Sequence, residues 1–102
     1  MIRINNGEEI RAQGEAIYRK GLRKHNGKLI LTSQRLVFIP LNKRRKQVGK
    51  AKIIDLRKGA LFFEKSHFYK GKGSLIVDEQ DGEQLIFNIK EPHRWEQELQ
   101  NM

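Results

Sequence analysis

The residue types that carry out catalysis or bind metals are sparse in this sequence and poorly placed for either task. Cysteine is absent, which excludes disulfides and thiolate ligands. The histidines are far apart and show none of the short spacings that place two ligands on one metal ion: His25, His67 and His93. The serines lie in predicted turns without a nucleophile motif: Ser33, Ser66 and Ser74. The sequence therefore predicts a protein that is not an enzyme and that uses no metal or cofactor.

Lysine and arginine, in contrast, are abundant and unevenly distributed. The 102 residues have a formal net charge of +9. Residues 10–77 contain 18 Lys and Arg side chains against three acids, a balance of +15, whereas residues 78–102 have a balance of −5. This asymmetry predicts one cationic surface, which would attract a polyanion, and one anionic element.

Two basic segments, residues 20–28 and 42–52, are the predicted ligand-binding site. Glycine, asparagine and charge dominate both, so we interpret them as loops. The candidate residues that would contact an anionic headgroup or a partner are Lys20, Arg23, Lys24, Lys28, Lys43, Arg44, Arg45, Lys46, Lys50 and Lys52. A further basic group, expected toward the opposite end, surrounds two aromatic residues, Phe68 and Tyr69, of which we assign Phe68 to the core: Arg57, Lys58, Lys65, Lys70 and Lys72.

An anionic membrane surface is the first partner we expect, because each Lys or Arg near an anionic bilayer contributes about 1 kcal/mol. A protein partner, bound at a strand edge or beside the C-terminal helix, is the alternative. Nucleic acid is a third candidate, since the pI is ≈ 10.1, although no nucleic-acid-binding motif is recognisable. The charge could also serve solubility alone.

The sequence predicts a single soluble domain over residues 1–102. No apolar stretch approaches the roughly 18–20 residues that span a bilayer. The first ten residues lack the apolar central region of a secretory signal. We therefore expect a cytoplasmic protein, peripheral at the membrane if the lipid hypothesis holds.

Strands are the elements expected to position these residues. Alternating apolar residues predict a first strand over residues 8–20, with Gly14 at a bend or bulge. Shorter strands are expected at 52–56 and 60–68, with a turn at 57–59 and a loop at 69–74. Residues 74–89 show the clearest hairpin pattern, because Asp81-Gly82 separates two alternating apolar arms.

The segment GKLILTSQRLVFIP, residues 27–40, holds the densest apolar run of the chain. It is interrupted by Thr32 to Arg35, whose polar side chains can satisfy exposed backbone groups. We interpret this break as the turn of a hairpin between two core strands. The sequence therefore predicts about seven antiparallel strands in a mainly β fold.

A C-terminal helix is expected to complete the domain. Pro92 suits a first helical position, and Trp95, Leu99 and Met102 follow at spacings of four and three residues. This apolar face could plug the open end of strongly bent strands, with Trp95 as the largest plug residue.

These features together resemble the GRAM domain family, which has a pleckstrin-homology-like barrel. The likeness rests on NGEEI (6–10), GKLILTSQRLVF (27–38), IIDL (53–56), DGEQLIFNI (81–89) and the terminal Trp95. It covers nearly the whole chain, and the charged stretch 41–52 departs from it most. The resemblance implies a barrel of about seven strands capped by one C-terminal helix. It also implies a binding module for anionic lipids, including phosphoinositides, or for protein segments.

The resemblance further implies where the loops lie. In such a barrel the loops after strands one, three and six share one end, so the two basic segments would form a cationic rim that also includes the acids of residues 78–83. Arg35, within the signature, has two interpretations: a ligand contact, or an ion pair that anchors the turn. The second is favoured because the motif keeps Arg35 beside the turn.

Overall fold

The computed structural model describes residues 4–20, 22–56, 59–65, 72–79, 84–90, 94, 95, 97 and 98, and these residues are mainly β. Seven strands follow one another along the chain: β1 (Ile10–Lys20), β2 (Arg23–Thr32), β3 (Arg35–Pro40), β4 (Lys52–Asp55), β5 (Gly59–Lys65), β6 (Lys72–Glu79) and β7 (Gln84–Lys90). The expectation of a mainly β fold with about seven antiparallel strands is therefore confirmed.

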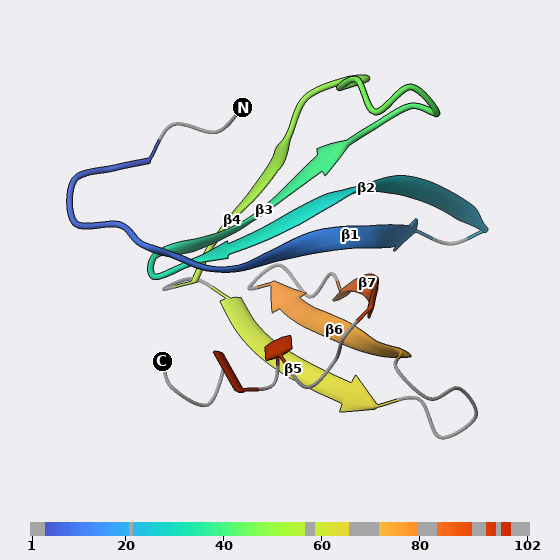
Figure 1. Cartoon of the computed structure of the whole chain (residues 1–102). Helices are drawn as coiled ribbons and strands as arrows, with labels where there is room; N and C mark the ends of the chain where they lie inside the picture. The colour runs from blue at the N-terminus through green and yellow to red at the C-terminus, as the bar shows by residue number, and fades with distance from the viewer. Residues whose placement is uncertain are drawn as a thin grey trace.

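All seven strands belong to one antiparallel sheet with the order β4-β3-β2-β1-β7-β6-β5. The sheet curls, so that β1 to β4 lie over β5 to β7, and the join between the two layers is the pairing of β1 with β7 (Figure 1). The outermost strands, β4 and β5, leave the curl open. The curl creates an inner face that is shielded from water.

The inner face holds the main hydrophobic core. Its buried residues come from β1, β2, β3, β4, β6 and β7: Ala12, Ala16, Tyr18, Leu29, Leu31, Leu36, Phe38, Ile54, Leu75, Val77, Leu85, Phe87 and Ile89. They lie at alternate positions, as expected for strands with one face in the core. Each fully buried large side chain contributes about 1.5–3 kcal/mol, so this cluster supplies much of the driving force for folding.

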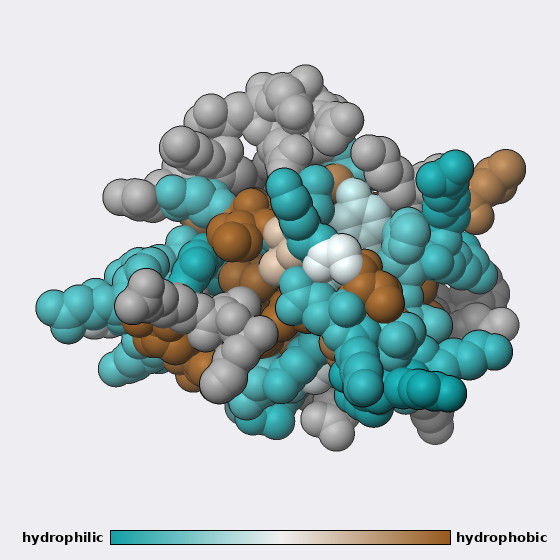
Figure 2. All heavy atoms as spheres, turned by 90° about the horizontal axis from the view of Figure 1, so that it is seen from above, coloured by the Kyte–Doolittle hydropathy of each residue, from teal (hydrophilic) through white to brown (hydrophobic). Residues whose placement is uncertain are grey.

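A second, smaller cluster lies on the outer face of β2 and β3. Ile30, Val37 and Ile39 are buried there, with Leu41 and Ala51 packed against them. Leu41 and Ala51 belong to the segment between β3 and β4, so this connection folds back onto the sheet. Among the described residues seen from above, hydrophilic ones predominate, and apolar residues show in patches among them (Figure 2).

The predicted hairpin of residues 27–40 is confirmed. Pairs such as Leu29 with Phe38 and Leu31 with Leu36 join β2 to β3, and only Ser33 and Gln34 separate the two strands. Glycine is required at position 27 of this hairpin, because neighbouring atoms of β3 leave no room for a side chain. A Cβ atom there would lie 2.6 Å from the ring of Phe38 and closer still to the carbonyl oxygen of Ile39.

Two predicted loops are wrong in part. Residues 20–28 were expected to be a loop, but β1 and β2 pair as far as Lys20 and Arg23. Arg23 and Lys24 are exposed and Lys28 is partly exposed, so a strand accommodates them without burying charge. Likewise, residues 72–74 of the predicted loop 69–74 are part of β6: all three pair with β7, and Gly73 and Ser74 also pair with β5. The irregularity of β1 also differs from expectation, because it falls between Ile10 and Ala12 while Gly14 pairs regularly with Leu29.

The predicted C-terminal helix lies mostly outside the described residues. Four residues of this segment are described and have helical backbone, but they do not make up a helix element. One of them is Trp95, whose side chain is buried and belongs to the main core, as the plug hypothesis expects. Among the described residues, no helix is long and apolar enough to cross a membrane.

Candidate anion-binding site

The segment between β3 and β4 is a basic loop, as predicted, and hydrogen bonds give it a defined shape. The side-chain oxygen of Asn42 accepts hydrogen bonds from the backbone N–H groups of Arg44 (2.9 Å) and Lys46 (3.0 Å). The backbone N–H of Asn42 donates to the Lys46 carbonyl oxygen at 2.9 Å. Within this turn Arg45 has a φ of 62°, in the left-handed region that Gly and Asn prefer. Because of this left-handed backbone, the side chain of Arg45 leaves the chain in a different direction from that of a residue in an extended loop.

Glu15, on the outer face of β1, ties this loop to the sheet. Its carboxylate accepts a hydrogen bond from the guanidinium of Arg45 and another from the ammonium of Lys90 on β7, at 3.2 Å. The hydrogen bond from Arg45, followed by that from Lys90, lowers the pKa of the Glu15 carboxyl below its ordinary value. One carboxylate thus bridges the loop, β1 and β7.

An open hollow of ≈ 860 Å³ lies around this bridge. Five strands or loops contribute to its lining: Glu15, Ala16, Ile17, Arg19, Lys24, Asn26, Gly27, Leu41, Asn42, Lys43, Arg45, Gly73, Ser74, Asn88, Ile89 and Lys90. Among these lining residues five are cationic and Glu15 alone is acidic. Asn and Ser side chains add neutral hydrogen-bonding groups, of which Ser74 and Asn88 bond to each other at 3.1 Å. The arrangement suits an anion, since cations surround it on several sides.

The structure divides the predicted site residues between several places. Three line the hollow: Lys24, Lys43 and Arg45. Four more are on the outer face of β2 or exposed on the loop, outside the lining of the hollow: Lys28, Arg44, Lys46 and Lys50. Arg23 and Lys52 are an even number of positions from the core residues Leu29 and Ile54 of their strands, and they therefore belong to the inner face. The Lys52 ammonium lies 5.9 Å from the centroid of the Tyr18 ring. Lys20 is described only as part of the β1 backbone.

The topology supports one part of the predicted rim. β1 and β3 are both antiparallel to β2 and therefore run in the same direction. The connections that follow them thus lie at the same end of the sheet (Figure 1). Of the four acids expected at this rim, Asp81 and Glu83 lie outside the described residues, and only the backbone of Asp78 and Glu79 is described. The same holds for the second basic group and its aromatic pair, of which only the backbone of Lys65 and Lys72 is described.

Sequence reasoning missed several residues of the hollow, above all Arg19, Lys90 and Glu15. Arg19 pairs with Lys24 across β1 and β2, which a hairpin register would have revealed once residues 20–28 were read as a strand. Lys90 is isolated within an acidic part of the sequence, and nothing local marks it. It joins the other cations because β7 pairs with β1, a contact between residues far apart in the chain.

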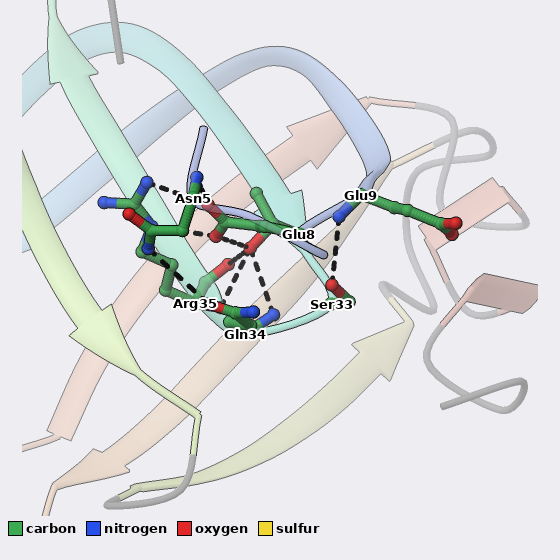
Figure 3. A network of polar contacts seen from close by, with 7 residues as sticks. Asn5, Glu8, Glu9, Ser33, Gln34 and Arg35 are labelled. Atoms are coloured by element: carbon green, nitrogen blue, oxygen red, sulfur yellow. Dashed lines mark hydrogen bonds and ion pairs between the residues drawn. The ribbon is translucent and has the colours of Figure 1, made fainter. Parts of the chain in front are cut away.

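A second polar cluster lies at the turn between β2 and β3 (Figure 3). The guanidinium of Arg35 forms a two-pronged hydrogen bond with the carboxylate of Glu8, with Nε 2.8 Å from Oε2 and Nη2 2.9 Å from Oε1. The Thr32 hydroxyl donates to Glu8 at 2.5 Å, and the backbone N–H of Asn5 donates at 2.9 Å. The hydrogen bond from Arg35 is the main cause that lowers the pKa of Glu8 to about 2.

This cluster, Asn5, Glu8, Thr32 and Arg35, is called the clamp below. It attaches the segment before β1 to the β2–β3 turn, with help from Glu9, whose backbone N–H donates to the Ser33 hydroxyl at 3.0 Å. The side chain of Glu8 is fully buried and that of Arg35 is 16% exposed. The geometry therefore agrees with the turn-anchoring interpretation of Arg35.

Within the described part of the chain, no three His, Asp or Glu side chains gather as ligands for a metal ion. His25 is exposed, with its ring edge against Tyr18 at a centroid distance of 6.2 Å. The other two histidines, His67 and His93, lie outside the described residues.

Comparison with known proteins gives a fold relative and no family. No family model matches the chain, and no curated protein matches it. The C-terminal domain of an unknown protein from Leishmania infantum, known from a crystal structure, has a similar fold, with a TM-score of 0.66. The two chains are 13% identical, and the match covers 89% of this chain and 81% of the other. At that identity the likeness concerns the fold alone.

Proposed function

We propose that this protein is a non-catalytic module that binds anionic membrane surfaces at the cytoplasmic side. The observation that carries the proposal is the gathering of cations from β1, β2, β7 and the 41–51 loop around one hollow. These segments are far apart in the sequence, and their convergence is more specific than a high net charge.

The charges are sufficient for peripheral binding. Each Lys or Arg close to an anionic bilayer contributes about 1 kcal/mol, so five cations together would give substantial affinity at low salt. The interaction would weaken with salt, because the Debye length falls to about 8 Å at physiological ionic strength. The exposed cations of the 41–51 loop, Arg44, Lys46 and Lys50, extend the same surface beyond the hollow.

The finer description of the fold is part of this proposal. The chain is a GRAM-type domain, in which the curled sheet is a pleckstrin-homology-like barrel and a C-terminal helix covers its open end. Support comes from the clamp, because its residues Glu8, Thr32 and Arg35 lie in two stretches that resemble the family, residues 6–10 and 27–38. The burial of Trp95 in the main core further supports a C-terminal element that packs on the sheet.

Vesicle flotation tests the function. Wild-type protein is mixed with phosphatidylcholine vesicles that contain or lack phosphatidylserine, at low and at physiological salt. Lys24→Glu and Lys43→Glu are made singly and together, because both side chains line the hollow and are exposed. Arg94→Glu, at an exposed residue outside the lining of the hollow, is the matched control with the same change of net charge.

We expect binding to the anionic vesicles only. Each single reversal at the hollow should weaken it by about fivefold or more, which corresponds to the contribution of at least one cation, and the control should bind nearly as wild type does. Equal losses in all variants would mean that net charge alone matters. Absence of wild-type binding at low salt would overturn the proposal. Binding to a duplex oligonucleotide in the same buffer would then favour nucleic acid, and no binding to either would favour a protein partner.

A further inference from the structure

Leu22 is the most exposed large apolar residue among those described. Its exposure is 104% of the reference value, whereas Ile4, Ile10, Val48 and Ile53 range from 42% to 57%. A fully exposed leucine is unfavourable in water, and no packing within the described residues offsets that cost. The residues that follow it, Arg23 and Lys24, are exposed cations.

The β1–β2 hairpin carries Leu22 beyond the end of β3. β1 and β2 pair as far as Lys20 and Arg23, while the pairing of β2 with β3 ends at Gly27 and Pro40. Residues 23–26 of β2 therefore extend past the end of β3 (Figure 1). Because a ladder of backbone hydrogen bonds supports the tip of the hairpin, its insertion into another medium would order few additional residues.

The chemistry around the tip indicates what could receive Leu22. Arg19, Arg23 and Lys24 are exposed on the same hairpin, and Arg19 and Lys24 also line the hollow. An apolar tip with cations behind it matches an anionic bilayer, where phosphate groups lie outside the hydrocarbon. Charge complementarity thus favours a bilayer over an apolar pocket in a protein, which would leave the cations without partners.

We propose that Leu22 is an apolar anchor, which enters the acyl-chain region of an anionic bilayer while the cations of the β1–β2 hairpin stay among the headgroups. This inference rests on the proposed function and adds a second, salt-independent contribution to it. Binding at a membrane interface grows with both the apolar area buried and the attraction to anionic lipids, so the two contributions add.

Removal of the anchor should weaken vesicle binding without affecting the fold. Burial of a leucine side chain corresponds to roughly 10- to 100-fold in a partition constant. We therefore expect Leu22→Ser to bind phosphatidylserine-containing vesicles at least about tenfold more weakly than wild type, with an unchanged thermal unfolding midpoint. Ile10→Ser, at the opposite end of β1, is the matched control and should bind as wild type does.

Tryptophan fluorescence gives a direct measure of insertion. The chain has one tryptophan, Trp95, which is buried and supplies a constant background. Leu22→Trp and Ile10→Trp are each bound to phosphatidylserine vesicles whose phosphatidylcholine carries bromine on its acyl chains. We expect a blue shift and quenching for Leu22→Trp and neither change for Ile10→Trp.

The outcomes separate this inference from the function on which it rests. If wild type binds anionic vesicles but Leu22→Trp is not quenched and Leu22→Ser binds normally, the anchor is wrong and the function stands. If wild type binds no vesicles, the proposed function fails and the anchor fails with it. Quenching of both tryptophan variants would also overturn the proposal, since insertion would then not be specific to the hairpin tip.

Discussion

Two clusters near opposite ends of β2 use the same pair of residue types, a glutamate and an arginine, in different surroundings. In the clamp, Glu8 is buried and accepts hydrogen bonds from the Arg35 guanidinium, the Thr32 hydroxyl and a backbone N–H. In the hollow, Glu15 is 48% exposed and holds the ammonium of Lys90 together with the guanidinium of Arg45. The two regions therefore differ in burial and in the number of hydrogen bonds at the carboxylate.

This difference separates a structural ion pair from one that can exchange partners. The buried pair is retained because opening it would leave a charge without a partner in a medium of low polarity. The exposed pair contributes little to stability, and water or another anion can replace Glu15 at modest cost. We therefore infer that the clamp stabilises the fold and that the Glu15 bridge prearranges cations for a ligand.

The largest expected effect is the loss of the clamp. Glu8→Gln keeps the size of the side chain but removes the charge that pairs with Arg35, so we expect a loss of about 3 kcal/mol in the free energy of unfolding. Chemical denaturation at neutral pH measures it. Glu9→Gln is the control, because the neighbouring side chain is exposed and should change stability by less than about 0.5 kcal/mol. Equal effects at the two positions would contradict the structural role of the buried pair.

Acid should remove part of the same contribution. The pKa of Glu8 is about 2 in the folded protein, below the ordinary value of 4.5, so its stabilising effect is fully present above pH 4.5. This effect is lost progressively as the pH falls from 4.5 toward 2, when the folded state begins to take up the proton. The stability difference between wild type and Glu8→Gln should therefore narrow over this range in denaturation experiments.

If the stability difference between wild type and Glu8→Gln stays constant between neutral pH and pH 3, the contribution of Glu8 does not depend on its ionisation. In that case the shape of the side chain, rather than its charge, would account for the clamp. Glu9→Gln again serves as the reference, and its difference from wild type should stay small throughout.

The smallest expected effect on stability belongs to the hollow. Glu15→Gln should leave the unfolding midpoint nearly unchanged, because the bridge is exposed. It should strengthen binding to phosphatidylserine vesicles by about fivefold for each cation that it releases. Glu9→Gln raises the net charge by the same amount, but Glu9 lies beside Ser33, at the far end of β2 from the hollow. Equal gains in vesicle binding for both variants would therefore show that the position of Glu15 has no special role.

Part of the fold could be predicted from local patterns. The apolar alternation of residues 27–40 and their polar break led directly to the β2–β3 hairpin, since strands with one buried face have a period of two. The same alternation led to β1 and to the β6–β7 pair. The start of β2 was missed, because a glycine, an asparagine and several charges resemble a loop locally. Backbone pairing with β1 stabilises this stretch as a strand in spite of its composition.

Of the candidate site, only the basic loop could be predicted from the sequence. The run of cations in residues 42–52 marks an exposed charged segment in any fold. Arg23 and Lys24, adjacent in sequence, are assigned to opposite faces of β2, and no property of the residues themselves decides which one faces the hollow. The partnership of Glu15 with Arg45 and Lys90 depends on a fold-back of the loop and on the β1–β7 pairing.

The sequence by itself determined the charge, the periodicity and the polar turn, because each is set by residues that are close together in the chain. From these follow a mainly β fold, a basic loop and the anchoring role of Arg35. Only the tertiary structure decided which cations converge, which carboxylate bridges them and that Leu22 is exposed at the end of a paired hairpin. These features arise from contacts between distant segments, and such contacts depend on how the whole sheet curls around its core.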